Sequence, residues 1–103
     1  MASEIERFLF GEPVVVHFVT RFEFSKNTVS AEFLSFDCEK RLVAKFENAE
    51  IVTVEQDREE GDSLMLDIIG FDSYPFKGSW QFVLNCGSVE WSWNSSWPTI
   101  QDS

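Results

Sequence analysis

The stretch from Ser79 to Asn94, SWQFVLNCGSVEWSWN, constrains the fold more than any other part of the chain. If Cys86 and Gly87 form a two-residue turn, the bulky side chains of both arms fall on one side of the ribbon. The pairs on that side are Leu84 with Val89, Phe82 with Trp91, and Trp80 with Trp93. Aromatic cross-strand pairs add roughly 0.5–1.5 kcal/mol each beyond the burial of their area. The stretch therefore predicts a β-hairpin with one buried and one solvent-exposed face, which needs a second apolar layer.

Two further strands are predicted between Val14 and Phe36, joined by a turn at residues 25–28. The first strand, Val14 to Phe24, alternates between two faces. One face carries Val16, Phe18, Thr20, Phe22 and Phe24, and the other carries His17, Val19, Arg21 and Glu23. In the second strand, Val29, Ala31 and Phe33 then oppose Phe24, Phe22 and Thr20. Both strands therefore direct their larger apolar side chains to the same face.

A third strand follows if Cys38 and Glu39 form the next turn. The expected pairs are Ser35 with Leu42, Phe33 with Ala44, Ala31 with Phe46, and, on the far side, Glu32 with Lys45. Three strands then share one apolar face, which a slip of one residue in either turn would reverse.

A short N-terminal helix is predicted by the capping-box pair Ser3 and Glu6, with Gly11 positioned to end it. Its apolar side chains at helical spacing are Ile5, Phe8 and Leu9. The far face of the predicted sheet is also apolar, with Val15, Val19, Leu34 and Val43. We expect this helix or a partner protein to cover that face.

The remaining segments follow from local pattern. Residues 50–55 are predicted as a strand of undetermined register, and the apolar run from Leu64 to Phe71 as one strand buried on most of its surface. Residues 72–78, with Pro75 and Gly78, are predicted as a loop.

These predictions give a mainly β protein with one short N-terminal helix. We expect an antiparallel meander of about six to seven strands that forms a twisted sheet, an open barrel or a sandwich. At 103 residues the chain is expected to be one β-rich domain, residues 1–103, able to bury about two-thirds of its unfolded surface. Residues 95–103 are expected to be a tail that either packs back or is flexible.

The charge balance is strongly acidic, with eighteen acidic against eight basic residues and a net charge of −10. The resulting field repels nucleic acid and anionic membrane and attracts basic proteins, so we expect a basic protein partner, no direct nucleic acid binding and no membrane binding. The opening residues, MASEIERFLFGEP, lack the basic region of a signal peptide, so we expect a cytoplasmic protein. In that compartment Cys38 and Cys86 remain thiols.

Catalytic and metal motifs are not evident. His17 is the single histidine, and no nucleophile motif accompanies it. The acidic run near Gly61 does not fit the spacing of a calcium-binding loop, because that glycine falls one position early when counted from Asp57. Asp67 interrupts an apolar run and is expected to face water or to find a cationic partner. We therefore expect no catalytic residues, no metal and no cofactor, and an enzyme using Asp67 and His17 is the least favoured reading.

The predicted partner-binding residues come from two groups. The acidic loop contributes carboxylates that can contact a basic protein. The third and fourth tryptophans contribute aromatic rings of the kind that binding hot spots use. The candidates are Glu55, Asp57, Glu59, Glu60, Asp62, Trp93 and Trp97.

The succession from Leu42, with LVAKFENAEI, the strand at Leu64 to Ile69 and then Gly78-Ser-Trp-Gln-Phe, resembles small all-β immunity proteins of bacterial polymorphic toxin systems. The resemblance extends from Leu42 to the end of the chain and rests on hydrophobic spacing around Phe46 and Phe82. It implies a protein that binds and neutralises a toxin and is not an enzyme. It supplies core positions only, so no functional residue carries over.

The leading hypothesis is thus a non-enzymatic acidic protein-binding module, an immunity-type inhibitor of a basic enzyme such as a nuclease toxin. One alternative is a phage-encoded inhibitor or DNA mimic, which presents carboxylates where phosphates would dock. Another is a small-molecule or lipid carrier with a cavity lined by phenylalanine, of which the chain has eleven. The oligomeric state stays open, and a dimer formed through a strand edge is one option.

Overall fold

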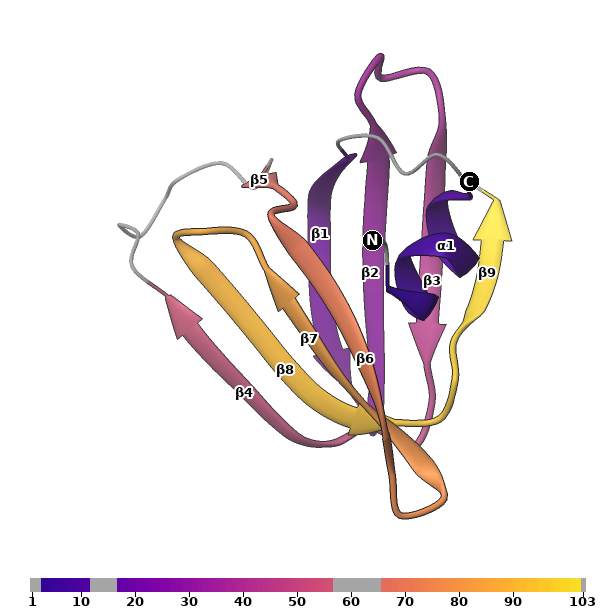
Figure 1. Ribbon diagram of the computed structural model, residues 1–103, viewed down its shortest axis with the longest axis vertical. Coiled ribbons are helices and arrows are strands. Elements are labelled where there is room, and N and C mark those ends of the chain that lie inside the picture. Colours follow the sequence, from indigo (N-terminus) through magenta and orange to yellow (C-terminus); the bar gives the residue numbers. More distant parts are fainter. Residues whose placement is uncertain (1–2, 12–16, 57–65, 103) are drawn as a thin grey trace.

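The computed structural model describes residues 3–11, 17–56 and 66–102. In this part of the chain, one helix and nine strands form two antiparallel sheets packed face to face (Figure 1). The first sheet has the order β5-β1-β2-β3-β9 and the second β4-β8-β7-β6. The elements are α1 (Glu4–Phe10), β1 (His17–Ser25), β2 (Thr28–Ser35), β3 (Arg41–Phe46), β4 (Glu50–Gln56), β5 (Leu66–Asp67), β6 (Gly70–Phe76), β7 (Ser79–Asn85), β8 (Val89–Ser95) and β9 (Thr99–Asp102). The prediction of a mainly β fold with one short helix is confirmed, and of the expected arrangements it is the sandwich that forms.

The turn between β1 and β2 is the two-residue turn that the sequence predicts. Lys26 and Asn27 have φ values of 53° and 61°, as a type I′ hairpin requires. Phe24 pairs with Val29 and Phe22 with Ala31, as predicted. A register shift between Val19 and Arg21 then inserts an extra residue.

This bulge overturns the predicted faces of the first half of β1. Val19, not Thr20, pairs with Phe33, and Val19 is fully buried. Thr20 instead donates a hydrogen bond to the carboxylate of Glu32. His17 stacks on Phe10, with ring centroids 4.2 Å apart, so it lies on the inner side and not with Arg21. The alternation in the sequence continues through the bulge and gives no sign of it.

Two predicted registers are wrong by two residues, which leaves the buried faces correct because side chains alternate with a period of two. Ala31 pairs with Ala44 in place of Phe46, and Phe82 with Trp93 in place of Trp91. The β2–β3 turn is longer than expected, because the N–H of Ser35 bonds to the carbonyl of Lys40 and leaves four residues between them. The β7–β8 turn keeps two central residues but lies one position further along the chain, because the N–H of Cys86 bonds to the carbonyl of Val89.

The prediction of one strand from Leu64 to Phe71 is wrong for its described part. After the two-residue β5, the N–H of Ile68 bonds to His17 in the first sheet and the N–H of Ile69 bonds to Asn85 in the second. The chain therefore crosses from the first sheet to the second between Ile68 and Ile69, in the middle of the apolar run.

The predicted loop at residues 72–78 is also wrong, since most of it belongs to β6. Pro75 is compatible with a strand here because β6 is the edge of its sheet, where a missing N–H costs no ladder bond. The turn lies at Lys77 and Gly78, both with positive φ.

Helix α1 has the predicted capping box, in which Ser3 and Glu6 bond to each other's backbone N–H. One prediction was that this helix covers the outer face of the first sheet, and that prediction is wrong. Ile5 and Leu9 are buried in the core, and the ring of Phe10 lies 5.4 Å from that of Phe33. The Ser3 hydroxyl also donates to the carbonyl of Phe71 in β6. The helix thus fills one side of the space between the sheets (Figure 1).

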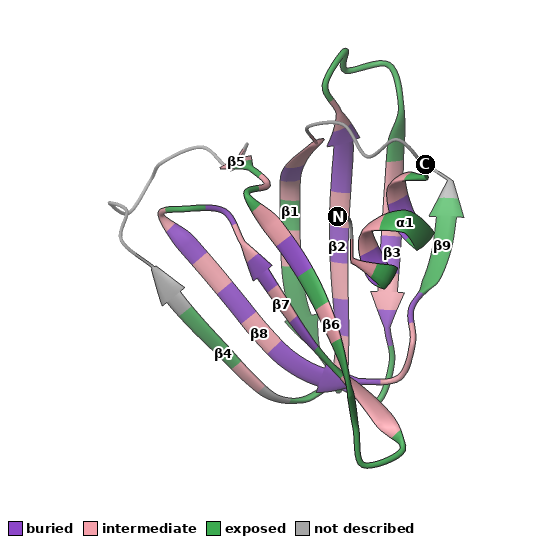
Figure 2. Cartoon of the chain, in the orientation of Figure 1, coloured by how far each residue is buried: buried purple, intermediate pink, exposed green. Residues whose placement is uncertain are grey.

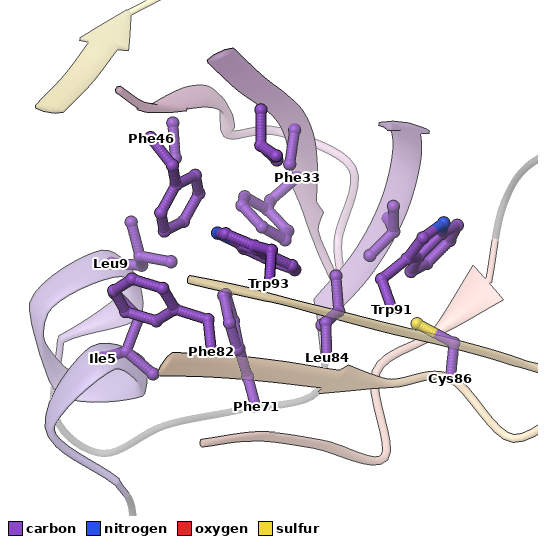
Figure 3. Packing of buried hydrophobic residues seen from close by; sticks show 14 of the residues in the cluster. Ile5, Leu9, Phe33, Phe46, Phe71, Phe82, Leu84, Cys86, Trp91 and Trp93 are labelled. Atoms are coloured by element: carbon purple, nitrogen blue, oxygen red, sulfur yellow. The ribbon is translucent and has the colours of Figure 1, made fainter. Parts of the chain in front are cut away.

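The centre of the core is a ring of aromatic side chains around Trp93, shown in Figure 3. The ring centroids of Phe46, Phe82 and Phe71 lie 5.0, 5.7 and 6.0 Å from that of Trp93. Figure 2 shows that burial is concentrated in β2, β7 and β8, whereas β4 and β9 at the margins are largely exposed. The tail packs back, because β9 pairs with β3 and places Ile100 opposite Ala44.

Candidate partner-binding surface

The outer face of the second sheet follows from the register of its four strands. Phe82 and Leu84 of β7 point into the core, so the residues that alternate with them, Gln81, Val83 and Asn85, point outward. Cross-strand pairing places Asp72, Val83, Ser92 and Thr53 in one row, and Tyr74, Gln81 and Asn94 in the next. Asn85 and Glu90 form a third row. Asn94 is buried, so the accessible outer face consists of Thr53, Asp72, Tyr74, Gln81, Val83, Asn85, Glu90 and Ser92.

Charge is distributed unevenly between the sheets. Strands β4, β6, β7 and β8 contain four acidic residues and no Lys, Arg or His. These acidic residues are Glu50, Glu55, Asp72 and Glu90. The first sheet, in contrast, has basic residues in β1 and β3. A basic molecule is therefore attracted to the second sheet more than to the first.

The predicted acidic loop falls largely outside the described residues. The structure does not describe four of its predicted partner-binding residues, Asp57, Glu59, Glu60 and Asp62. Glu55 is in β4, where it pairs with Glu90, and its side chain is not described. Glu90 and Asp72 are described acidic residues on the outer face of the second sheet.

The prediction of Trp93 as a partner-binding residue is wrong. Its side chain is 1% exposed, because the two-residue shift of the hairpin register puts it opposite Phe82 in the centre of the core. Trp97 is half-buried, and its ring lies 4.7 Å from Trp80 and 5.3 Å from Phe8. It closes the edge of the core beside the helix, with part of its surface still accessible.

The aromatic side chains that the second sheet does expose are Tyr74, with 50% of its surface accessible, and Phe76. Both point outward from β6, and the Nζ of Lys77 lies 5.4 Å from the centre of the Phe76 ring. These residues were missed because residues 72–78 were predicted as a loop. Hydrophobic alternation gives no signal for this strand, because the polar Ser73 lies on the inner side and the aromatic Tyr74 and Phe76 on the outer side.

The side chains capable of catalysis or metal binding have ordinary structural settings. Asp67 is exposed in β5 opposite Phe18, so it faces water as one of its predicted alternatives required. Among the described residues, no group of three or more His, Cys, Asp or Glu side chains could hold a metal ion. The hydroxyl of Ser35 and the N–H of Glu39 lower the pKa of the Asp37 carboxyl, which stabilises the turn between β2 and β3.

The two thiols differ sharply. Cys38 is exposed, whereas Cys86 is buried at the end of β7. Burial raises the pKa of the Cys86 thiol to about 12, and the nearby charge of Asp67 adds to this effect. Cys86 is thus held neutral and unreactive at ordinary pH.

A shallow pocket of about 240 Å³ lies where the β1–β2 turn meets the chain between β3 and β4. It is lined by Asn27, Asn48, Ala49 and Glu50, and the N–H of Ala49 bonds to the carbonyl of Asn27 across it. Phenylalanine does not line this pocket. Phe46 and Phe82 instead pack against each other, with centroids 4.9 Å apart.

No helix in the described ranges has the length and apolar character needed to cross a membrane. No protein-family model, curated protein or solved structure matches this chain. The function must therefore be inferred from the surface of the molecule itself.

Proposed function

We propose that this protein is a non-enzymatic, cytoplasmic, acidic protein-binding module that inhibits a basic enzyme, such as a nuclease toxin, in the manner of an immunity protein. The observation that carries the proposal is the absence of any basic residue from the four strands of the second sheet, in a chain of net charge −10. An outer face of one sign attracts a basic surface and repels nucleic acid and other acidic proteins.

The side chains on this outer face also suit protein recognition. Tyr74 offers a large ring with few rotatable bonds, and Gln81 and Asn85 offer adaptable hydrogen-bonding groups. Asp72 and Glu90 provide carboxylates that arginine can bind through two hydrogen bonds. The face therefore combines steering by charge with groups that can hold a partner in one orientation.

Two alternatives make different demands. A DNA mimic uses the same acidic face, so it requires that DNA and the protein compete for one site on the target. A carrier requires an apolar cavity, and the aromatic side chains around Trp93 fill the space that such a cavity would need. The carrier is thus the less favoured of the two.

The test begins with immobilised protein and an extract of the cells that produce it. A partner recovered at low ionic strength is purified, and its association rate is measured with the Asp72→Lys/Glu90→Lys variant. Steered association should slow by about tenfold at low salt, and the difference should vanish at high salt.

The matched control is Glu39→Lys/Glu47→Lys, which makes the same change of charge at exposed positions outside the second sheet. This control should slow association much less than the variant of the second sheet. A partner that associates equally fast with all three proteins at low salt, or whose own surface is acidic, would contradict the proposal.

A further inference from the structure

Within the described ranges, no strand pairs with the outer edge of β4. It is the outermost strand in the order β4-β8-β7-β6, and its described partner strand is β8 (Figure 1). An unpaired edge presents backbone N–H and C=O groups that can accept another strand. With seven residues, β4 is long enough to hold an incoming peptide in register.

The register identifies which groups face the open edge. The Cys86 N–H bonds to the Val89 carbonyl, so alternate residues of β8 from Val89 onward direct their backbone towards β7. Ser92 therefore directs its backbone towards β4, where it pairs with Thr53. The next residue of β4, Val54, directs its N–H and C=O away from β8. These two groups of Val54 are free to bond to an added strand.

The other long edge of this sheet is protected. Strand β6 carries Pro75, which has no N–H to offer. The Ser3 hydroxyl donates to the Phe71 carbonyl of β6, and helix α1 packs against the same strand. No comparable device covers β4 in the part of the chain that the structure describes.

The side chains beside the open edge specify the chemistry of the incoming strand. Val54 pairs with Trp91 and so belongs to the inner side, yet 51% of it is exposed because β4 extends beyond the first sheet. Thr53 and the exposed Glu50 offer polar and acidic groups, and β4 contains no basic residue. A second copy of this chain would bring two acidic strands together, which like charges disfavour.

We propose that the edge of β4 binds an extended segment of the partner whose residues alternate between apolar and basic. The apolar side chains cover Val54, the basic ones meet the acidic outer side, and the added backbone pairs with Val54. This inference rests on the proposed function and specifies how the basic partner is held.

The probe is the synthetic peptide acetyl-Lys-Val-Lys-Val-Lys-Val-Lys-amide, with binding measured by titration at low ionic strength. In an antiparallel pair its valines lie opposite Val54, so their nitrogens face β4. N-methylation of the valine nitrogens removes these donors and should weaken binding at least about tenfold. Methylation of the backbone nitrogens of three of the four lysines gives a peptide of the same charge and composition whose altered groups face solvent, and it should change binding little.

Val54→Pro provides the complementary test in the protein. It removes the N–H that faces the open edge without breaking a bond to β8, and Val54→Thr is its matched control with that N–H intact. Binding of the unmodified peptide should fall about tenfold for the proline variant only. The Val54 amide should also exchange with solvent more slowly in the complex.

The outcomes separate this inference from the proposed function. If the peptide methylated on valine binds as tightly as the unmodified one, charge alone holds it. The acidic binding function then stands and the edge inference falls. If none of the three peptides binds, the edge inference also falls. The function is then decided by whether a basic partner is recovered from the cell extract.

Discussion

The two sheets contribute to the core in different ways. The second sheet contributes Trp93, Phe82 and Phe71 to the centre of the core, whereas the buried positions of β2 and β3 in the first sheet combine the large Phe33 and Phe46 with the small Ala31 and Ala44. Small side chains among the large ones of the first sheet leave room for the rings of the second.

The outer faces differ in another way. On the first sheet, two acids have basic neighbours: Arg21 lies 2.9 Å from Glu23, and Arg41 lies 3.7 Å from Glu32. On the second sheet, Asp72 and Glu90 have no basic residue in any strand of their sheet. Exposed ion pairs contribute little to stability, so stability alone does not account for the difference. The outer face of the second sheet is therefore the one whose negative charge is not neutralised by neighbouring basic residues.

The largest expected effect comes from removing the central ring of the second sheet. Trp93→Ala should lower the free energy of unfolding by about 3–5 kcal/mol, because it leaves a cavity that the first sheet cannot fill. Urea denaturation followed by circular dichroism measures the change. Trp97→Ala is the matched control, since it removes the same side chain from a half-buried position at the edge of the core. Equal losses for the two variants would mean that Trp93 is not central to the core.

The opposite change on the first sheet tests whether its small residues are required. Ala44→Leu adds volume to a fully buried position and should cost about 1–3 kcal/mol of unfolding free energy. Val43→Leu makes a small increase at the neighbouring position on the outer face, where about 0.5 kcal/mol or less is expected. The same denaturation assay compares the two. Tolerance of Ala44→Leu would show that the first sheet has room to spare.

Apart from the first half of β1, where a bulge reverses the faces, the sequence was sufficient to predict which faces are buried but not how the strands are aligned. The β7–β8 and β2–β3 registers were wrong by two residues, because hydrophobic alternation reports the face and is blind to a shift of one full period. The β1–β2 turn, where Lys26 and Asn27 both adopt positive φ, lies where its residues suggested, whereas the β2–β3 turn is longer and the β7–β8 turn is displaced by one residue. The length and position of the turn, and not the strand pattern, decide the register.

The candidate site was predicted less well than the fold. The choice of Trp93 depended on the register, and an error of two residues moved it from the end of the hairpin to the centre of the core. Tyr74 and Phe76 were missed because Pro75 suggested a loop, and a sequence does not reveal that a strand lies at an edge. The acidic character was evident from composition, but its concentration on one sheet depends on which strands pair.

The two cysteines allow a last comparison between the sheets, through the pH dependence of stability. The pKa of the Cys86 thiol is about 12 in the folded protein, against an ordinary value of 9.0. A thiol whose folded pKa is raised stabilises the fold fully below pH 9 and loses this contribution as the pH rises towards 12, because the unfolded chain releases the proton first. Wild type should therefore lose about 1.4 kcal/mol between pH 8 and pH 10 relative to Cys86→Ala. Cys38, exposed in the turn of the first sheet, should give no such difference when replaced by alanine. Urea denaturation at the two pH values measures both gaps, and a gap for Cys86→Ala that stays constant would show that its thiol titrates alike in the folded and unfolded chain.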